Sequence, residues 1–160
     1  MKQTIPLYKV DAFTDQLFHG NRAAVCLLDT PRDAAWMQAV ATEMNLSQTA
    51  CIRQTGSGYE LRWFTPTTEV HLCGHATLAA AHVLWEQKLI SLDTPASFNT
   101  RSGILSACYT KEGIELEFPA VPANPARRLM ISCRHWERPV QWCHAAALTC
   151  QFNRSTIHTH

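Results

Sequence analysis

The segment Cys73-Gly74-His75 places a thiol and an imidazole at the start of an apolar, alanine-rich stretch, His75–Lys88. The stretch is apolar nearly all round, which is typical of a helix inside a domain. The first N–H groups of a helix have no intrahelical partner and attract anions, so a carboxylate could bind at Gly74 and His75 without a dedicated arginine. His75 could relay a proton or bind substrate there, or it could simply cap its own helix.

Asn21 is a second candidate, at the end of the loop Thr14–Asn21. Its amide could hold a substrate, or the residue could serve a turn by accepting a left-handed backbone after Gly20. The seven cysteines stand singly and none belongs to a CxxC pair, so the sequence gives little support for a zinc site or a redox pair.

Short strands and two helices must position these residues. Helical spacing predicts a helix over Asp33–Asn45, and Thr65–Leu72 is expected to be a loop. Strands are predicted, from alternation, apolar runs and turn residues, over Leu7–Phe13, Ala23–Leu28, Ser47–Arg53, Tyr59–Phe64, Ala96–Thr100, Ile104–Thr110 and Ile114–Phe118. We therefore expect an α+β domain in which a sheet wraps around the buried helix.

The composition excludes several classes of function. The chain has 160 residues and a formal net charge of +1, so it is long enough for one domain and gives no argument for nucleic acid or an acidic membrane surface as partner. It has neither an apolar run of membrane-spanning length nor a signal-peptide pattern. We expect a cytoplasmic protein.

Three segments in register carry a resemblance to a known family. They are Asp11-Ala12-Phe13 with Gly20-Asn21 and Ala23-Ala24-Val25, then Glu43-Met44-Asn45-Leu46-Ser47-Gln48-Thr49-Ala50, and finally Arg62-Trp63-Phe64-Thr65-Pro66 leading to Cys73-Gly74-His75-Ala76-Thr77. In order and spacing they closely resemble the N-terminal half of the PhzF-like (phenazine biosynthesis-like) isomerase family, over about residues 5–125. The family usually has proline after the asparagine, where this chain has Arg22.

The resemblance implies a fold similar to diaminopimelate epimerase. That fold has two similar domains, each with a mixed or antiparallel sheet around one central helix, and an active site between them. It also implies proton transfer next to a carboxylate or unsaturated group of a small metabolite, with no cofactor, no metal and a homodimer for the full-length protein.

The resemblance also assigns the site. It implies that Cys73 and His75 are catalytic and that the substrate contacts Asn21, Ser47, Gly74 and Ala76. Gln48 stands where the family has its general base, a glutamate. An amide cannot take a proton at useful pH, so Gln48 is a binding residue, a sign of altered chemistry, or the mark of a site that has lost activity.

Cys73 is the candidate replacement for that base. Related racemases and epimerases of this fold use a thiol at a comparable place before the glycine, and a helix N-terminus would favour the thiolate. The alternative is that Cys73 is carried without acting as the base.

The resemblance stops after Pro125, which divides the chain into a domain over 1–125 and a tail over 126–160. The tail has no clear period of 2 or 3.6 and is expected to pack poorly. Codons can be chosen for Met130–His160 so that a one-nucleotide shift reads as a short helix, a glycine turn and a valine-rich strand. We interpret the tail as an out-of-frame segment, the alternative being a divergent but genuine one, and the second domain as absent.

Two classes of function remain. The first is a PhzF-like isomerase that is truncated and inactive as this chain, with a racemase or epimerase using Cys73 as a variant of it. The second is a non-catalytic module that binds a small carboxylate or pairs with another subunit.

Overall fold

The computed structural model describes residues 4–14, 18–56, 58–110, 113–118 and 145–146. Their strands and helices, in chain order, are β1 (Leu7–Ala12), β2 (Asn21–Leu28), α1 (Ala34–Met44), β3 (Gln48–Thr55), β4 (Gly58–Phe64), β5 (Glu69–Val70), α2 (Gly74–Glu86), β6 (Ala96–Thr100), β7 (Gly103–Thr110), β8 (Gly113–Glu117) and β9 (Ala145–Ala146). None of the helices in these residues is long and apolar enough to cross a membrane.

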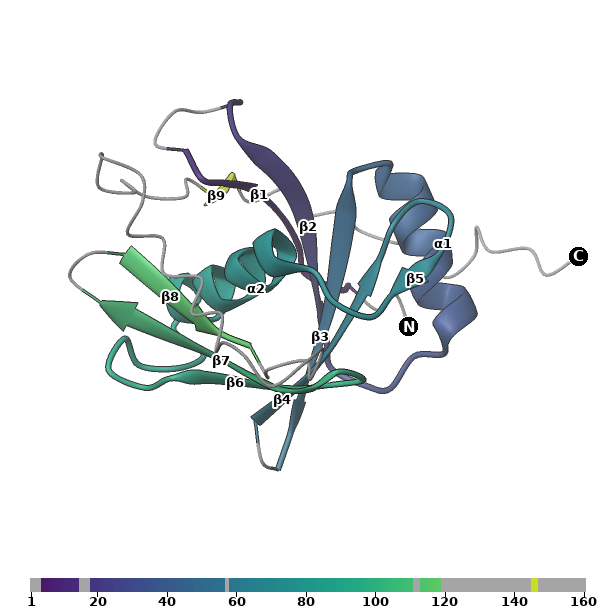
Figure 1. Cartoon of the computed structure of the whole chain (residues 1–160). Helices are drawn as coiled ribbons and strands as arrows, with labels where there is room; N and C mark the ends of the chain where they lie inside the picture. Colours follow the sequence, from purple (N-terminus) through teal and green to yellow (C-terminus); the bar gives the residue numbers. More distant parts are fainter. Residues whose placement is uncertain (1–3, 15–17, 57, 111–112, 119–144, 147–160) are drawn as a thin grey trace, which may run out of the picture.

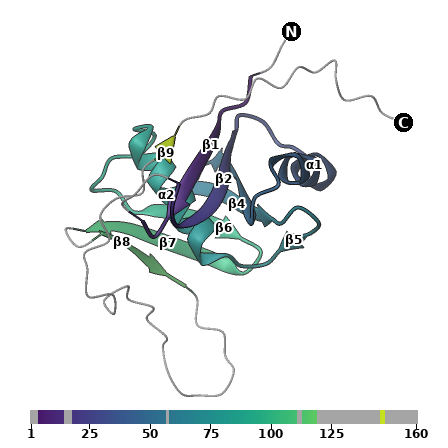
Figure 2. The same cartoon turned by 90° about the horizontal axis from the view of Figure 1, so that it is seen from above.

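One curled sheet holds all the strands, and it wraps around α2 (Figures 1 and 2). The strand order is β8-β7-β6-β4-β3-β2-β1-β9, with β5 beside β4. The pairs β2–β3 and β4–β6 are parallel, and the chain crosses through α1 in the first case and α2 in the second. The remaining pairs are antiparallel. The predicted α+β fold, a mixed sheet around one central helix, is confirmed.

The burial of α2 follows from its sequence. Nine of its 13 residues are buried, on every side of the helix, among them Ala76, Ala80 and Leu84. Small alanine side chains allow the sheet to approach closely, and strand residues such as Ile52, Leu61 and Phe98 complete the core around them. Only a narrow stripe of His75, His82 and Glu86 is polar and not fully buried, so the rest of the helix requires this enclosure.

Helix α1 packs on the opposite, outer face of the sheet and buries one side only, through Met37, Val40 and Ala41. The Asp33 side chain caps its start by accepting a hydrogen bond from the Trp36 N–H at 2.7 Å, and the left-handed Asn45 ends it. The sheet therefore separates two apolar layers, one around α2 and one beneath α1.

The expected elements recur with boundaries shifted by a few residues, and two short strands, β5 and β9, were not predicted. Glu69–Val70, expected as loop, forms β5 against Trp63 and Phe64 of β4. Within the segment 126–160 the structure describes only Ala145–Ala146, which pair with Lys9 and Val10 of β1. The poor packing and out-of-frame origin expected for the rest of that segment lie outside the described residues and stay predictions.

The turn between β3 and β4 offers a matched pair of glycines. Gly58 has a φ of 131°, and a Cβ there would lie 2.8 Å from the Ser97 carbonyl oxygen, whereas a Cβ on Gly56 would meet nothing within 4 Å. We expect Gly58→Ala to lower the free energy of unfolding by about 1–3 kcal/mol through strain. Gly56→Ala should change it by no more than about 0.5 kcal/mol. Urea unfolding of both variants measures this, and equal midpoints would contradict it.

Candidate active site at the start of α2

The starts of β2, β3 and α2 come together at one edge of the sheet. Strands β2 and β3 are parallel neighbours with Ala23 opposite Gln48, so both begin at the same edge. This places Asn21 and Arg22 beside Ser47. Helix α2 begins at the same place, with Cys73 as its N-cap residue in an extended conformation.

A continuous series of side-chain contacts joins these segments. The Ser47 hydroxyl lies 2.6 Å from the Arg22 carbonyl oxygen and 3.2 Å from the Asn21 Oδ1. Its oxygen is also 3.4 Å from the Nε2 of His75. The Nδ1 on the other side of that ring lies 3.3 Å from the Cys73 sulfur. The imidazole thus bridges a hydroxyl and a thiol, a geometry that can pass a proton from one side of the ring to the other.

Gln48 lies on the face of the sheet that packs against α2. Side chains alternate along a strand, and Ala50 and Ile52 of β3 belong to the core around α2, whereas Cys51 belongs to the layer beneath α1. Gln48 shares the face of Ala50, and its Oε1 is buried with no hydrogen-bond partner among the described residues. A buried amide oxygen without a partner is costly in a finished core, so it is available to a bound molecule.

The backbone at the start of α2 contributes donors. The Cys73 side chain makes no capping hydrogen bond, but the N–H groups of His75 and Ala76 lie near enough to its sulfur to lower the pKa of the thiol in part. Gly74 has no side chain, and a Cβ there would lie 3.6 Å from the Phe118 ring. The predicted site residues Asn21, Ser47, Gly74 and Ala76 therefore surround or adjoin the Cys73–His75 pair.

Two opposing effects act on the pKa of the Cys73 thiol. Helix N-termini favour thiolates, yet burial raises the pKa of the Cys73 thiol above its usual value, and the N–H groups of Ala76 and His75 offset only part of this. The N–H groups at the helix start do favour the thiolate, as expected, but the loss of solvation outweighs them. Cys73 rests as a thiol and needs a base to ionise.

The neighbouring imidazole is such a base. Burial lowers the pKa of His75 below its usual value of 6.5, because a charged ring would lose solvation. His75 is therefore neutral at pH 7 and carries a lone pair on one ring nitrogen. A neutral imidazole beside a protonated thiol is the resting state of a proton-transfer pair.

This lowered pKa predicts a pH dependence of stability. Below pH 6.5 the unfolded chain binds a proton at His75 more readily than the folded chain does, so the free energy of unfolding should fall as the pH drops from 7 towards the folded-state pKa. We expect His75→Gln to lose less stability than the wild type over that interval. Urea midpoints at several pH values test this, and parallel curves for the two proteins would contradict it.

The structure shows the local geometry of two residues for which alternatives were left open. Asn21 begins β2 and does not have a positive φ, whereas Phe18 and Gly20 before it do, at 68° and 93°, so Asn21 is not the left-handed residue of this turn. Among the described residues, the contacts of the His75 ring go to the side chains of Ser47 and Cys73 rather than to the helix backbone. A capping role for His75 has no support.

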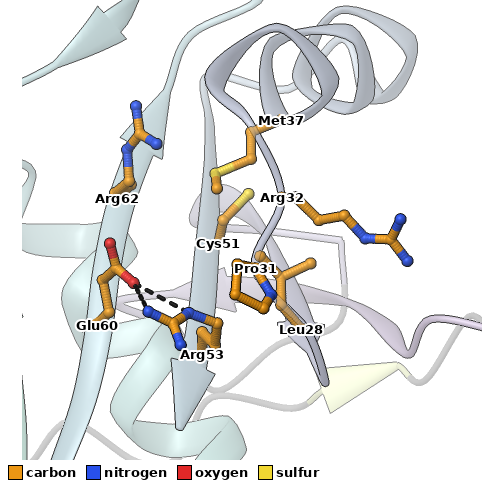
Figure 3. A pocket seen from close by; sticks show the side chains of 8 residues that line it. All are labelled: Leu28, Pro31, Arg32, Met37, Cys51, Arg53, Glu60 and Arg62. Atoms are coloured by element: carbon orange, nitrogen blue, oxygen red, sulfur yellow. Dashed lines mark hydrogen bonds and ion pairs between the residues drawn. The ribbon is translucent and has the colours of Figure 1, made fainter. Parts of the chain in front are cut away.

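A second feature lies on the outer face of the sheet and was not predicted. A hollow of about 110 Å³ is lined by Leu28, Pro31, Arg32, Met37, Cys51, Arg53, Glu60 and Arg62, with Arg53 paired to Glu60 across β3 and β4 (Figure 3). A shallower groove of about 520 Å³ shares Arg53, Glu60 and Arg62 and continues over β6. Neither includes Cys73 or His75, because α2 lies on the other side of the sheet.

Metal ligands do not gather in the described ranges of the chain. No group of three histidine, cysteine, aspartate or glutamate side chains there is close enough to hold a metal ion.

Comparisons with known proteins place this geometry in context. The family model described as "Phenazine biosynthesis-like protein" matches residues 10–156. A protein of Halalkalibacterium halodurans named as an uncharacterized isomerase is 62% identical over 117 residues, which are 73% of this chain and 44% of that protein. The family match runs into the segment 126–160, whereas the match to this relative covers about three quarters of the chain.

Solved structures agree on the fold. The crystal structure of an Enterococcus faecalis protein of the PhzF family superposes with a TM-score of 0.67 at 40% identity, covering 75% of this chain and 49% of that one. A hydroxyproline epimerase from Agrobacterium vitis, at 11% identity and a TM-score of 0.56, shows the same fold. The chain spans about half the length of the proteins that it matches.

Proposed function

This chain belongs to the phenazine biosynthesis-like family, and on that premise we propose that it forms the N-terminal half of a cofactor-independent isomerase that moves a proton next to the carboxylate of a small metabolite. The observation that carries the proposal is the His75 ring between the Cys73 sulfur and the Ser47 hydroxyl, at the start of a buried helix. Its relatives include proteins named as isomerases, which supports the general reaction class.

The proposed proton transfers balance without a further reagent. His75 accepts the thiol proton of Cys73 on Nδ1, and the N–H groups of His75 and Ala76 hold the resulting thiolate. The thiolate removes the proton from the carbon next to the substrate carboxylate and becomes a thiol again, while the carbon keeps the electron pair. A group on the counterpart half gives a proton to another carbon, or to the other face, and is itself reprotonated through solvent by the proton that His75 releases, so the protons balance.

The start of α2 fits the charge of the substrate. Its remaining N–H donors and the amide of Gln48 can hydrogen-bond the carboxylate, which becomes enolate-like when the proton leaves. In this proposal Gln48 binds and does not act as a base, and Asn21 completes the polar wall on the β2 side.

The chain by itself is expected to be inactive. It spans 44% of the length of its Halalkalibacterium relative, and the resemblance places the active site between two domains. We propose that the counterpart half supplies the group that returns the proton and closes the site to water.

A chimera tests the proposal directly. Residues 5–118 of this chain would replace the matching segment of the Halalkalibacterium relative. The chimera and the chain alone would each be incubated in deuterium oxide with a mixture of common 2-amino, 2-hydroxy and β,γ-unsaturated carboxylic acids. Mass spectrometry should find deuterium in one class of acid with the chimera and none with the chain alone.

The contrasting candidate is a non-catalytic module that binds a small carboxylate, favoured by the amide at position 48. It predicts that both proteins shift the melting temperature with a carboxylate and that neither incorporates deuterium into any acid. Exchange by the chimera that survives His75→Gln would also overturn the proposed role of the Cys73–His75 pair.

A further inference from the structure

The protons around Ser47 can be assigned by counting donors and acceptors. A serine hydroxyl has one proton. Both oxygens nearest to it, the Arg22 carbonyl at 2.6 Å and the Asn21 Oδ1 at 3.2 Å, accept hydrogen bonds. The shorter contact takes the proton, and with either partner the proton points away from His75.

This assignment fixes which nitrogen of His75 carries its proton. With its own proton engaged, the Ser47 oxygen can only accept from Nε2 across 3.4 Å. A neutral imidazole has one N–H, so the proton sits on Nε2 and the lone pair on Nδ1. That lone pair faces the Cys73 sulfur at 3.3 Å and can accept the thiol proton. The hydrogen bonds therefore run in one direction, from Cys73 through His75 and Ser47 to the Arg22 carbonyl.

The Arg22 carbonyl is held by contacts on the opposite face of the sheet. Asp11 and Arg22 are register partners on β1 and β2, and alternation places both on the outer face, since Val10, Ala12 and Ala23 belong to the core around α2. The Phe18 N–H donates to the Asp11 Oδ2 at 3.1 Å, and the Arg22 Nη2 donates to the Phe18 carbonyl at 3.3 Å. The Arg22 Nε lies 3.7 Å from the Asp11 Oδ1. We refer to Asp11, Phe18 and Arg22 as the clasp.

The two charged side chains of the clasp differ in their exposure to solvent. The Asp11 side chain is 12% exposed and the Arg22 side chain 46%. The Asp11 Oδ1 is buried with no hydrogen-bond partner among the described residues, so the Arg22 guanidinium is its nearby counter-charge. Gly20 lets the chain turn between them, because a Cβ there would collide with the Ala12 carbonyl oxygen and lie 2.7 Å from the Thr14 Cγ2.

We propose that the clasp is a positioning device for proton transfer: it holds the Arg22 carbonyl where it takes up the Ser47 proton, and so keeps His75 protonated on Nε2 with a bare Nδ1 facing Cys73. None of the three clasp residues touches the Cys73–His75 pair. The proposal deepens the proposed function and rests on it in one respect, that this pair moves the proton.

The test reads the ring protonation directly, without a substrate. The full chain would be labelled with ¹⁵N-histidine, and its two-bond ¹H–¹⁵N spectrum recorded about 1.5 units above the usual pKa of histidine, so that the rings are neutral. The chain has eight histidines, and the spectrum of His75→Gln identifies the signals of His75. We expect the wild-type ring to carry its proton on Nε2.

The informative variant is Arg22→Gln, because Arg22 is half-exposed whereas a change at the buried Asp11 could prevent folding. Loss of the clasp should raise the Nδ1-protonated fraction about five- to tenfold, the effect of weakening one hydrogen bond. The rate at which iodoacetamide alkylates Cys73, followed by peptide mass spectrometry, should fall in parallel. Arg22→Lys keeps a cation near Asp11 and should restore much of both.

Arg53→Gln is the matched control, since it removes another cross-strand arginine–carboxylate pair from the same outer face, and it should leave the His75 spectrum unchanged. A wild-type ring protonated on Nδ1, or an Arg22→Gln spectrum identical to the wild type whatever its stability, would overturn the proposal. Failure of the chimera to exchange deuterium would overturn the proposed function and leave the ring assignment standing, so the two can fail separately.

Discussion

Replacing Cys73 with alanine in the chimera is expected to lower the rate of deuterium incorporation by about 10²–10⁴-fold, the contribution of a positioned acid–base group. The thiol is the group that would meet the substrate carbon, and alanine can neither release nor accept a proton. Mass spectrometry of the exchanged acid measures the effect. Cys108→Ala is the control, because that cysteine is exposed on β7, and it should leave the rate unchanged.

A rescue variant identifies the proton-carrying group more sharply. Adding Gln48→Glu to the Cys73→Ala chimera puts a carboxylate at the start of β3, on the face that packs against α2. Since a carboxylate can take the proton that an amide cannot, this double variant should recover a measurable part of the exchange. Undiminished exchange in Cys73→Ala alone would exclude the thiol as base.

Replacing Phe98 with alanine is expected to lower the free energy of unfolding by about 3–5 kcal/mol. Phe98 lies on β6 with no exposed surface, and its ring packs 6.5 Å, centroid to centroid, from that of Tyr59. The substitution would leave a cavity beside α2 that the enclosing sheet could not fill. Urea unfolding of the chain, followed by tryptophan fluorescence, gives the value.

Phe18→Ala removes the same atoms from a side chain that is 74% exposed, so its effect should stay within about 0.5 kcal/mol. Its backbone contacts in the clasp are kept. Equal midpoints for Phe98→Ala and Phe18→Ala would mean that the core around α2 is not the main source of stability.

The spacing of apolar residues along the sequence predicted the elements in which one pattern of burial continues over the whole length. Helix α2 could be found because an all-apolar helix has only one stable environment, and α1 because its apolar residues share one face. The strand β5 could not, since two residues show no alternation, and Glu69–Val70 pairs only because the loop returns alongside β4. Contacts distant in sequence decide such short strands.

For the candidate site, the residues could be predicted from the sequence, but their arrangement and protonation could not. The resemblance indicated Ser47, Cys73 and His75, but not that the imidazole would lie between the other two, because that depends on the parallel pairing of β2 with β3. The raised pKa of Cys73 could not be predicted either, since it reflects how closely neighbouring segments cover the sulfur. One sequence feature could have indicated the arginine-lined hollow. Cys51 and Arg53, and likewise Glu60 and Arg62, stand two residues apart on paired strands and therefore share one face of the sheet.

The enclosure of α2 also governs how the domain can open. Because the sheet covers all of that helix except the narrow stripe of His75, His82 and Glu86, most of its amides cannot reach solvent unless strands separate from it, so their hydrogen exchange should report global unfolding. Helix α1 covers one face only and can detach while the core around α2 persists. The start of α2, where Cys73 and His75 lie, is therefore attached to the slowest-opening part of the domain, and the proton-transfer pair would keep its geometry through most local fluctuations.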